Sequence, residues 1–442
     1  MANTYLTRTP SSTGNDKVAT FSAWIKRNSS LGAQNNLFTS FPASERTQLF
    51  FTASGTLQLQ AYSGNSATMN VETNRKFKDV NGWYHIVVSM DSTQANASDR
   101  VKIYVNGVQE TSLAQSSYVS QNTTLSFNTS GRAFYIGTYD TTQLFFDGIM
   151  SHVHWIDGTA YTASTFGSTD ATTGAWKINT APSLTMGTNG FSILKDDNTI
   201  TDQSSNSNNL SLGGGTLTKS EDNPSNIFAT WNPLWSASNG NVGDVAFSNG
   251  NTTTTTSTSY RTTPTTLGMS GSGKYYWEVK RIEDNDGDVH FGVMSENATP
   301  ANTATWIGNA ANGWIIAGDN GQLYTGGSSV SSPLTNGAVA NGAIHMCAFD
   351  ASTGKLYFGT NGSWAGTANP TTGANPHFTL DTSLTYFPVV STGSDVSANF
   401  GNGYFGTTAV SSAGTNASGF GIFEYDVPTG FTALCTKGIN SF

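Results

Sequence analysis

Residues 101–107 read VKIYVNG and residues 355–362 read KLYFGTNG. In each stretch apolar and polar residues alternate and lead into an Asn-Gly pair, Asn106-Gly107 and Asn361-Gly362. Asn-Gly tolerates positive φ at both central positions of a type I′ turn, so each stretch predicts a β-hairpin. The two hairpins lie in separate halves with different flanking residues. We therefore predict an all-β chain of two antiparallel β-sandwich domains in series, a plan that favours presenting loops to a partner over catalysis.

Strand patterns fill the rest of the chain, and the only helical signal is one turn around residues 163–166. Such short strands with frequent turn signals are typical of sandwiches and barrels. In FFDGIMSHVHWIDG (145–158), period-two alternation predicts that Ile149, Val153 and Trp155 share one face.

The composition is unusual for a soluble protein. Charged residues make up only 11% of the 442 residues, against roughly 25% in ordinary domains, while aromatic residues reach 12%. This favours an extracellular or virion protein kept in solution by neutral polar groups; the alternative is that short polar residues simply fill many turns. The net charge of −9 without a basic stripe argues against nucleic-acid binding.

A composition shift predicts the domain boundary. We assign residues 1–228 to the first sandwich, with a polar Gly/Asn/Ser-rich tail segment at about 196–226, and residues 229–442 to the second. The N-terminal MANTYLTRTP is polar and no apolar run approaches the ~18–20 residues that span a bilayer, so neither a secretory signal nor membrane insertion is expected.

Few residues carry the signature of catalytic or metal chemistry. The only Glu-x-Asp, Glu424-Tyr425-Asp426, lacks the second Glu of a retaining glucanase, so we predict no catalytic residues. His152 and His154 lie two apart on one predicted strand, but no third metal ligand is identifiable. Cys347 and Cys435 sit in apolar strand-like contexts, which predicts buried free thiols.

Two kinds of loop residue are candidates for binding. The acidic loop EDNDGD (283–288) places Asp284, Asp286 and Asp288 at alternate positions, a weak calcium candidate, and Asn285 and Asp286 are candidates for a partner contact. The other interpretation is a plain hairpin turn, and we otherwise expect no cofactor. Trp306 and Trp364 lie in predicted loops; an indole there either packs locally or stacks on a sugar ring or protein partner.

Two ordered sets of motifs resemble known domains. FSAWIKR, GWYHIVVSMD, VKIYVNG, AFYIGTY and FFDGIMSHVHWIDG make residues about 18–160 resemble the concanavalin A-like, laminin-G-like sandwich. KYYWEVKRI, HFGVM, GWIIAGDNGQLYTG, GKLYFGTNGSW and YFPVVSTGSDVSANFG make residues about 273–405 resemble the SPRY domain. The combination is similar to tail-fibre-like or virion structural proteins of tailed marine bacteriophages.

This resemblance implies a non-enzymatic virion protein, assembled in the host cytoplasm and displayed on the particle surface. Its loops would bind a host-surface glycan or receptor, or neighbouring virion proteins, and it would form homo-oligomers. One alternative is a capsid decoration or cement protein without host binding; another is a polysaccharide-degrading enzyme on the concanavalin-like domain. The chain departs from long tail fibres because no trimeric shaft repeat is present.

Overall fold

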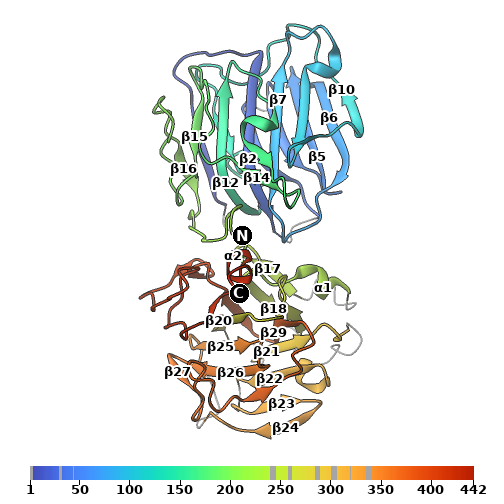
Figure 1. The fold of residues 1–442 in the computed structure, drawn as a ribbon. Helices are drawn as coiled ribbons and strands as arrows, with labels where there is room; N and C mark the ends of the chain where they lie inside the picture. The colour runs from blue at the N-terminus through green and yellow to red at the C-terminus, as the bar shows by residue number, and fades with distance from the viewer. Residues whose placement is uncertain are drawn as a thin grey trace. The chain divides into compact units, whose positions relative to one another are not determined.

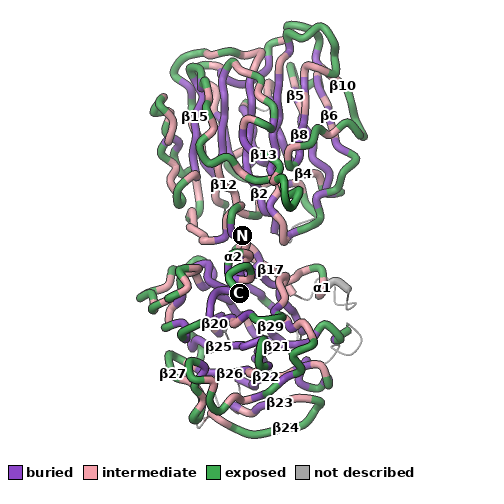
Figure 2. Tube along the Cα trace, in the orientation of Figure 1, coloured by how far each residue is buried: buried purple, intermediate pink, exposed green. Residues whose placement is uncertain are grey.

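The computed structural model describes residues 3–28, 32–42, 44–238, 245–256, 261–283, 289–299, 306–318, 320–334 and 340–442. The chain divides into two compact units, residues 1–219 (unit 1) and residues 220–442 (unit 2). Each unit is built from β-strands joined by turns (Figure 1). Within each unit the buried residues follow the strands, and most connecting turns are exposed (Figure 2).

Unit 1 contains two antiparallel sheets and a small hairpin. The eight-stranded sheet has, in spatial order, β10 (Leu113–Ser117), β6 (Ser66–Lys76), β5 (Thr56–Ser63), β4 (Thr47–Phe51), β3 (Asn35–Ser40), β11 (Phe134–Ile136), β1 (Tyr5–Arg8) and β16 (Ser211–Gly214). The six-stranded sheet has β15 (Phe191–Ile193), β12 (Gly148–Asp157), β2 (Val18–Arg27), β7 (Tyr84–Asp91), β8 (Val101–Val105) and β9 (Val108–Gln109). The hairpin pairs β13 (Gly167–Thr169) with β14 (Trp176–Ile178), and two 3-10 turns complete the unit, η1 (Ala97–Asp99) and η2 (Ala163–Thr165).

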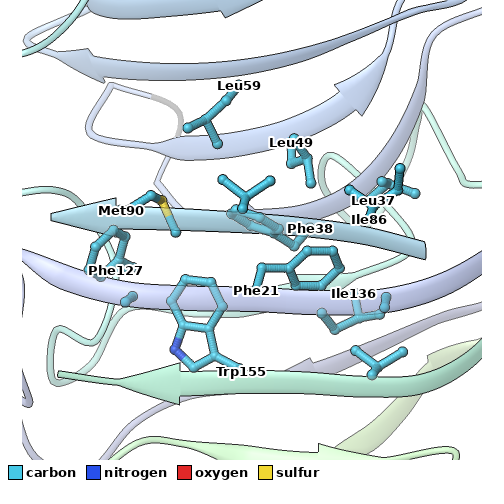
Figure 3. Packing of buried hydrophobic residues seen from close by; sticks show 14 of the residues in the cluster. Phe21, Leu37, Phe38, Leu49, Leu59, Ile86, Met90, Phe127, Ile136 and Trp155 are labelled. Carbon is cyan, nitrogen blue, oxygen red and sulfur yellow. The ribbon is translucent and has the colours of Figure 1, made fainter. Parts of the chain in front are cut away.

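The core of unit 1 lies between its two sheets. Apolar side chains at alternate positions of both sheets form one buried cluster. Figure 3 shows its aromatic centre, where the Phe38 ring lies 5.0 Å from the Phe21 ring and 5.3 Å from the Trp155 ring, between centroids. Aromatic packing at these distances adds to the free energy gained by burying the rings.

Unit 2 also contains two large sheets. The nine-stranded sheet has β17 (Val245–Ser248), β18 (Thr253–Thr256), β30 (Asp395–Asn399), β20 (Lys274–Glu283), β25 (Ile344–Asp350), β26 (Lys355–Thr360) and β27 (Ser363–Trp364), with β28 (Phe378–Thr379) on β26 and β33 (Thr432–Ala433) parallel to β20. The six-stranded sheet has β19 (Arg261–Pro264), β29 (Tyr386–Thr392), β21 (Val289–Ser295), β22 (Gly313–Ala317), β23 (Leu323–Thr325) and β24 (Ser328–Ser331). Short elements complete the unit: the hairpin β31 (Tyr404–Phe405) with β32 (Thr408–Ala409), the helices α1 (Pro233–Ser238) and α2 (Thr436–Ile439), and η4 (Ile307–Asn309).

The predicted all-β fold of two sandwiches in series is confirmed, including both hairpins that opened the sequence argument. Asn106 and Gly107 connect β8 to β9 with φ of 46° and 83°, and Asn361 and Gly362 connect β26 to β27 with φ of 48° and 83°. Positive φ at both central residues is the type I′ geometry. Both cysteines are buried free thiols, as expected. Within the described residues, no helix has the length and apolar character needed to cross a bilayer.

Of the segments around the predicted domain boundary, one forms part of unit 1 and the next forms part of unit 2. In the polar segment about 196–226, Ser211–Gly214 forms strand β16 at an edge of the unit 1 sheet. Further on, the backbone N–H of Ala229 donates to the carbonyl of Leu434 at 2.9 Å, within unit 2. The boundary after residue 228 stays a prediction.

One predicted alternation is wrong. Ile149 pairs with Lys26, whereas Val153 and Trp155 lie in the core, so Ile149 does not share their face. A β-bulge between Ser151 and His154 is the cause, and His152 within it has a φ of +49°. An extra residue in one strand shifts every later side chain to the opposite face.

Candidate functional site

The outer face of the eight-stranded sheet in unit 1 carries polar side chains. In β5, Leu57 and Leu59 pack in the core, so the residues between and beyond them, Gln58 and Gln60, lie on the opposite face. β4 and β6 alternate in the same way: Gln48 and Asn70 lie between or beside core residues in the chain, so their side chains lie on the outer face too. This face is the candidate functional site.

The strand register aligns one polar side chain from every strand into a row. Thr39 pairs with Gln48, Gln48 with Gln60, and Gln60 with Asn70. We call the full set the polar row; from one edge of the sheet to the other it consists of Ser211, Thr7, Tyr135, Thr39, Gln48, Gln60, Asn70 and Ser117. Because neighbouring strands lie about 4.8 Å apart, hydrogen-bonding groups recur across the face at that spacing.

Hydrogen bonds between amide side chains fix the part of the polar row over β4, β5 and β6. Nε2 of Gln48 donates to Oε1 of Gln60 at 3.0 Å, and Nε2 of Gln58 donates to Oδ1 of Asn70 at 2.6 Å. Gln48 in turn accepts from Nδ2 of Asn36 at 3.3 Å. Each bond holds an amide plane in one orientation, so a ligand would not have to pay the entropy of ordering these side chains.

Two amide groups of this network still have free donors. Nε2 of Gln60 and Nδ2 of Asn70 make no hydrogen bond within the described part of the chain, and both residues are partly exposed. Each NH₂ group can donate two hydrogen bonds. The face over β5 and β6 therefore presents fixed N–H donors to solvent, whereas Thr39 and Gln48 in the middle of the polar row are buried.

Glu72 adds an acceptor next to these donors. It pairs with Gln58 across β5 and β6, and its carboxylate accepts from Oγ1 of Thr56 at 2.6 Å and from Nε2 of Gln58 at 3.3 Å. Each carboxylate oxygen has a further lone pair available. The polar row itself contains no carboxylate, so Glu72 is the single acid among the side chains named on this face.

Aromatic rings and one arginine border the polar row. The guanidinium carbon of Arg46 lies 3.5 Å from the centroid of the Tyr62 ring and 5.5 Å from that of Tyr139. The Phe41 ring lies 6.0 Å from Tyr135, a member of the polar row, and 6.5 Å from Tyr139. We call Phe41, Arg46, Tyr62, Tyr135 and Tyr139 the aromatic border.

Amide groups beside aromatic rings match the chemistry of a saccharide. Sugar hydroxyls donate and accept hydrogen bonds, which amide and carboxylate groups can satisfy with fixed geometry. The C–H face of a sugar ring is apolar and can pack on an aromatic ring.

The two tryptophans predicted as contacts do not form one site. Trp306 packs with Ile315 and Ala317, and its ring centroid lies 4.8 Å from that of His290. Ile315 alternates with a core residue of β22, so this cluster lies on the outer side of the six-stranded sheet of unit 2. Trp364 packs with a different cluster, which contains Tyr276.

Tyr276 in β20 alternates with the core residues Tyr275 and Trp277, so the cluster around Trp364 lies on the outer side of the nine-stranded sheet. The sandwich core separates Trp306 from Trp364. Both indoles are partly buried against their own sheets, and a contact role for either one stays a prediction.

The acidic-loop candidates cannot be placed. Asp284, Asn285, Asp286 and Asp288 lie outside the described residues, so the predicted calcium or partner contact stays a prediction. Among the residues that are described, no group of three or more His, Cys, Asp or Glu side chains is arranged to hold a metal ion.

Histidines on the outer face of the six-stranded sheet of unit 1 are held neutral. Trp176 donates from Nε1 to Nδ1 of His85 at 3.0 Å, so the ring carries its proton on Nε2, which donates to Oγ of Ser22 at 3.0 Å. Nδ1 of His154 lies 2.7 Å from Oγ of Ser192. Burial lowers the pKa of His85 and of His154 to about 3, and burial lowers that of His152 to about 4.

The carboxylates near the Glu-x-Asp motif anchor backbone in unit 2. Buried Glu278 accepts from the hydroxyl of Tyr276 at 2.9 Å and from the backbone N–H groups of Glu424 and Tyr425 at 3.0 and 2.9 Å. Burial raises the pKa of Glu278 to about 7. The Glu424 side chain binds Ser411, and Asp426 accepts from the backbone N–H of Thr415 at 2.7 Å.

The polar row was not predicted from the sequence. The signal was present in TLQLQAY (56–62), where two glutamines alternate with core residues. Alternation by itself predicts only a strand with one exposed face. It does not show which strands are neighbours or in what register they pair. The row becomes visible only when the strands of the sheet are aligned in register.

Two family models match the chain. Residues 2–165 match the concanavalin A-like lectin/glucanases superfamily, and residues 274–403 match the SPRY domain. The chain thus carries a concanavalin A-like domain in unit 1 and a SPRY domain in unit 2. The two domains indicate a ligand- or protein-binding β-sandwich protein. Every member of the polar row except Ser211 lies within the concanavalin A-like match.

Solved structures with these folds match parts of the chain. The SPRY domain of human HERC1 is 20% identical over 35% of this chain and 91% of its own, with a TM-score of 0.28. A native heptameric SAP-like pentraxin from Limulus polyphemus is 13% identical over 48% of this chain and 90% of its own, with a TM-score of 0.29. A human SPRY domain is 15% identical over 35% of this chain and 94% of its own, with a TM-score of 0.26. No curated protein matches the chain.

Proposed function

We propose that this chain is a non-enzymatic binding protein that holds a neutral saccharide on the outer face of the eight-stranded sheet. The observation that carries the proposal is the polar row, with free amide donors on Gln60 and Asn70 beside the aromatic border. Hydroxyls of the saccharide would accept from these amides and donate to Glu72, and one ring face would pack on Tyr62.

The affinity of one such site is modest. A neutral hydrogen bond contributes about 1 kcal/mol net, since the same groups bind water in the free state. A handful of these bonds corresponds to weak binding by one chain. Many copies displayed on one surface would raise the overall avidity by orders of magnitude.

The arrangement of acids supports a binding role over hydrolysis. A retaining glycosidase needs two carboxylates about 5 Å apart, one as nucleophile and one as acid/base. The described face offers Glu72, whose oxygens bind Thr56 and Gln58. We therefore include the absence of enzymatic activity in the proposal.

For the biological setting we propose the surface of a tailed-phage particle. The sequence motifs of this chain resemble those of tail-fibre-like and virion structural proteins of such phages. In this setting the saccharide belongs to the host surface, the chain assembles as a homo-oligomer, and other surfaces contact neighbouring virion proteins.

Saccharide binding is tested with the purified full chain on a panel of neutral oligosaccharides of glucose, galactose and mannose. A Gln60→Ala/Asn70→Ala double variant should bind at least tenfold more weakly than the parent, since two donors are lost. Gln109→Ala is the matched control, because Gln109 is an exposed glutamine on β9 of the other sheet. Equal binding by parent and double variant would refute the role of this face.

The setting needs separate measurements. Immunogold labelling of phage particles with an antibody to this chain should decorate the particle, and free chain should block adsorption to host cells. Labelling with no effect on adsorption would favour a decoration protein, and labelling confined to infected cells would remove the virion setting. Release of reducing ends from host polysaccharide would show an enzyme instead.

A further inference from the structure

A narrow pocket opens at one end of the unit 1 sandwich, next to the Thr7, Thr39 and Tyr135 part of the polar row and apart from Gln60 and Asn70. Its lining includes Arg8 at the end of β1, Ser126, Arg132, Phe134, Trp155 and Asn189. The pocket and the open solvent at its mouth together span about 300 Å³, and the enclosed part has room for a group of about the size of one water molecule. A whole sugar ring does not fit inside, whereas one oxygen of a ring substituent does, with the rest of the group in the open mouth.

The wall of this pocket contains a buried polar group without a partner. Ser126 is 8% exposed, and its hydroxyl makes no hydrogen bond within the described part of the chain. Asn189 is 2% exposed, and its Oδ1 accepts from Nη1 of Arg8 at 3.4 Å. A buried hydroxyl that lines a pocket and lacks a protein partner is available to a ligand.

Two arginines give the pocket a positive charge. Arg8 donates to the side chains of Asn189 and Asn208, and Nη1 of Arg132 donates to the carbonyl of Glu45 at 3.3 Å. A guanidinium has five N–H donors, so these bonds leave a majority of them available. Neither arginine forms an ion pair with a carboxylate of the described residues.

Two acids that bind residues around the pocket are already engaged. Oδ1 of Asp157 accepts from Nδ2 of Asn128 at 2.9 Å, and Oδ2 accepts from the backbone N–H of Asn189 at 2.9 Å. Asp202 accepts from the backbone N–H groups of Ser192 and Asn208, at 2.9 and 2.8 Å. Burial lowers the pKa of Arg8, and the attraction of Asp202 opposes that change.

We propose that this pocket binds one oxyanion, a carboxylate or sulfate carried by an acidic saccharide, between Arg8 and Arg132 with Ser126 as a third donor. Guanidinium groups bind planar or tetrahedral oxyanions through charge-assisted hydrogen bonds, which are stronger than neutral ones. The aromatic rings of Phe134 and Trp155 line the pocket and exclude water on their side, which strengthens these bonds. The saccharide as carrier rests on the proposed function; the oxyanion site does not.

Isothermal titration calorimetry of the full chain at constant ionic strength tests this site. The probes are glucuronate, glucose, sodium sulfate and sodium acetate. Glucuronate should bind more tightly than glucose and than either free anion, and Arg132→Gln should weaken glucuronate binding at least tenfold. Arg75→Gln is the matched control, because Arg75 is half exposed and pairs with Glu110 instead of lining the pocket.

Further variants separate this site from the outer face. The Gln60→Ala/Asn70→Ala variant should keep glucuronate binding, so failure of the proposed function and failure of this inference give different results. Ser126→Val fills the pocket without changing charge and should also weaken binding. Equal affinity for free sulfate and glucuronate would refute the saccharide carrier. Absence of binding by every anion, or unchanged binding by both Arg132→Gln and Ser126→Val, would overturn the proposal.

Discussion

Acid should destabilise unit 1 through two histidines that its sheet keeps neutral. His85 and His154 are 1% and 3% exposed, and burial lowers the pKa of each to about 3 from an ordinary value of 6.5. The unfolded chain therefore takes up protons below pH 6.5 while the folded chain does not. The free energy of unfolding that these histidines protect is fully present above pH 6.5 and is lost as the pH falls.

The magnitude follows from the two pKa values. At pH 5 an unfolded histidine with a pKa of 6.5 is almost fully protonated, which costs the fold about 2 kcal/mol per residue relative to pH 7.5. A folded-state pKa of 4 instead of 3 gives nearly the same figure, because both lie well below pH 5. Protonation of His85 would also place an N–H against the indole N–H of Trp176, which now donates to it.

The assay compares pH slopes between variants. Guanidinium unfolding of the parent and of His154→Gln is followed by circular dichroism at pH 7.5 and pH 5. Between these pH values the variant should lose about 2 kcal/mol less of its unfolding free energy than the parent. Gln109→His is the control, since an exposed histidine has similar pKa values in both states and should not change the slope. Identical slopes in parent and His154→Gln would refute the reasoning.

Three further outcomes are expected. Phe38→Ala should lower the unfolding free energy of unit 1 by about 3–5 kcal/mol in denaturant titration, since Phe38 is fully buried among aromatic rings; a loss under 1 kcal/mol would contradict this core. Gly107→Ala should lower the melting temperature more than Gly131→Ala, because both have positive φ but only at Gly107 would a Cβ overlap the ring of Trp176; equal losses would show that the ring moves away freely. The pKa of Glu278, raised by burial to about 7, means that unit 2 should lose about 1 kcal/mol of stability from pH 6 to pH 8.5. Glu278→Gln should lack that loss, and an unchanged pH slope in this variant would contradict the assignment.

Local patterns were sufficient to predict the fold. Alternation in VKIYVNG and KYYWEVKRI is a property of neighbouring residues, and Asn-Gly specifies its turn without reference to the rest of the chain. The exception is informative: nothing in FFDGIMSHVHWIDG marks the bulge at His152, so Ile149 was assigned to the wrong face. A bulge depends on the partner strand, which the local sequence does not contain.

The candidate site was far less predictable. Gln48, Gln60 and Asn70 form a row only because β4, β5 and β6 are neighbours in a particular register, and register is a long-range property. Trp306 and Trp364 were predicted as aromatic residues in loops, yet Trp364 lies in strand β27 and the two pack on opposite sides of the unit 2 core. Which face a side chain occupies, and what covers that face, emerges only from the assembled sheets.

Saccharide binding at the polar row is decided by the side-chain amide signals of the full chain, recorded by NMR during titration with the tightest-binding neutral oligosaccharide. The NH₂ resonances of Gln60 and Asn70 should shift with the ligand while that of Gln109 stays in place. Shifts confined to resonances away from the eight-stranded sheet, with Gln60 and Asn70 unmoved at saturation, would contradict binding at the polar row.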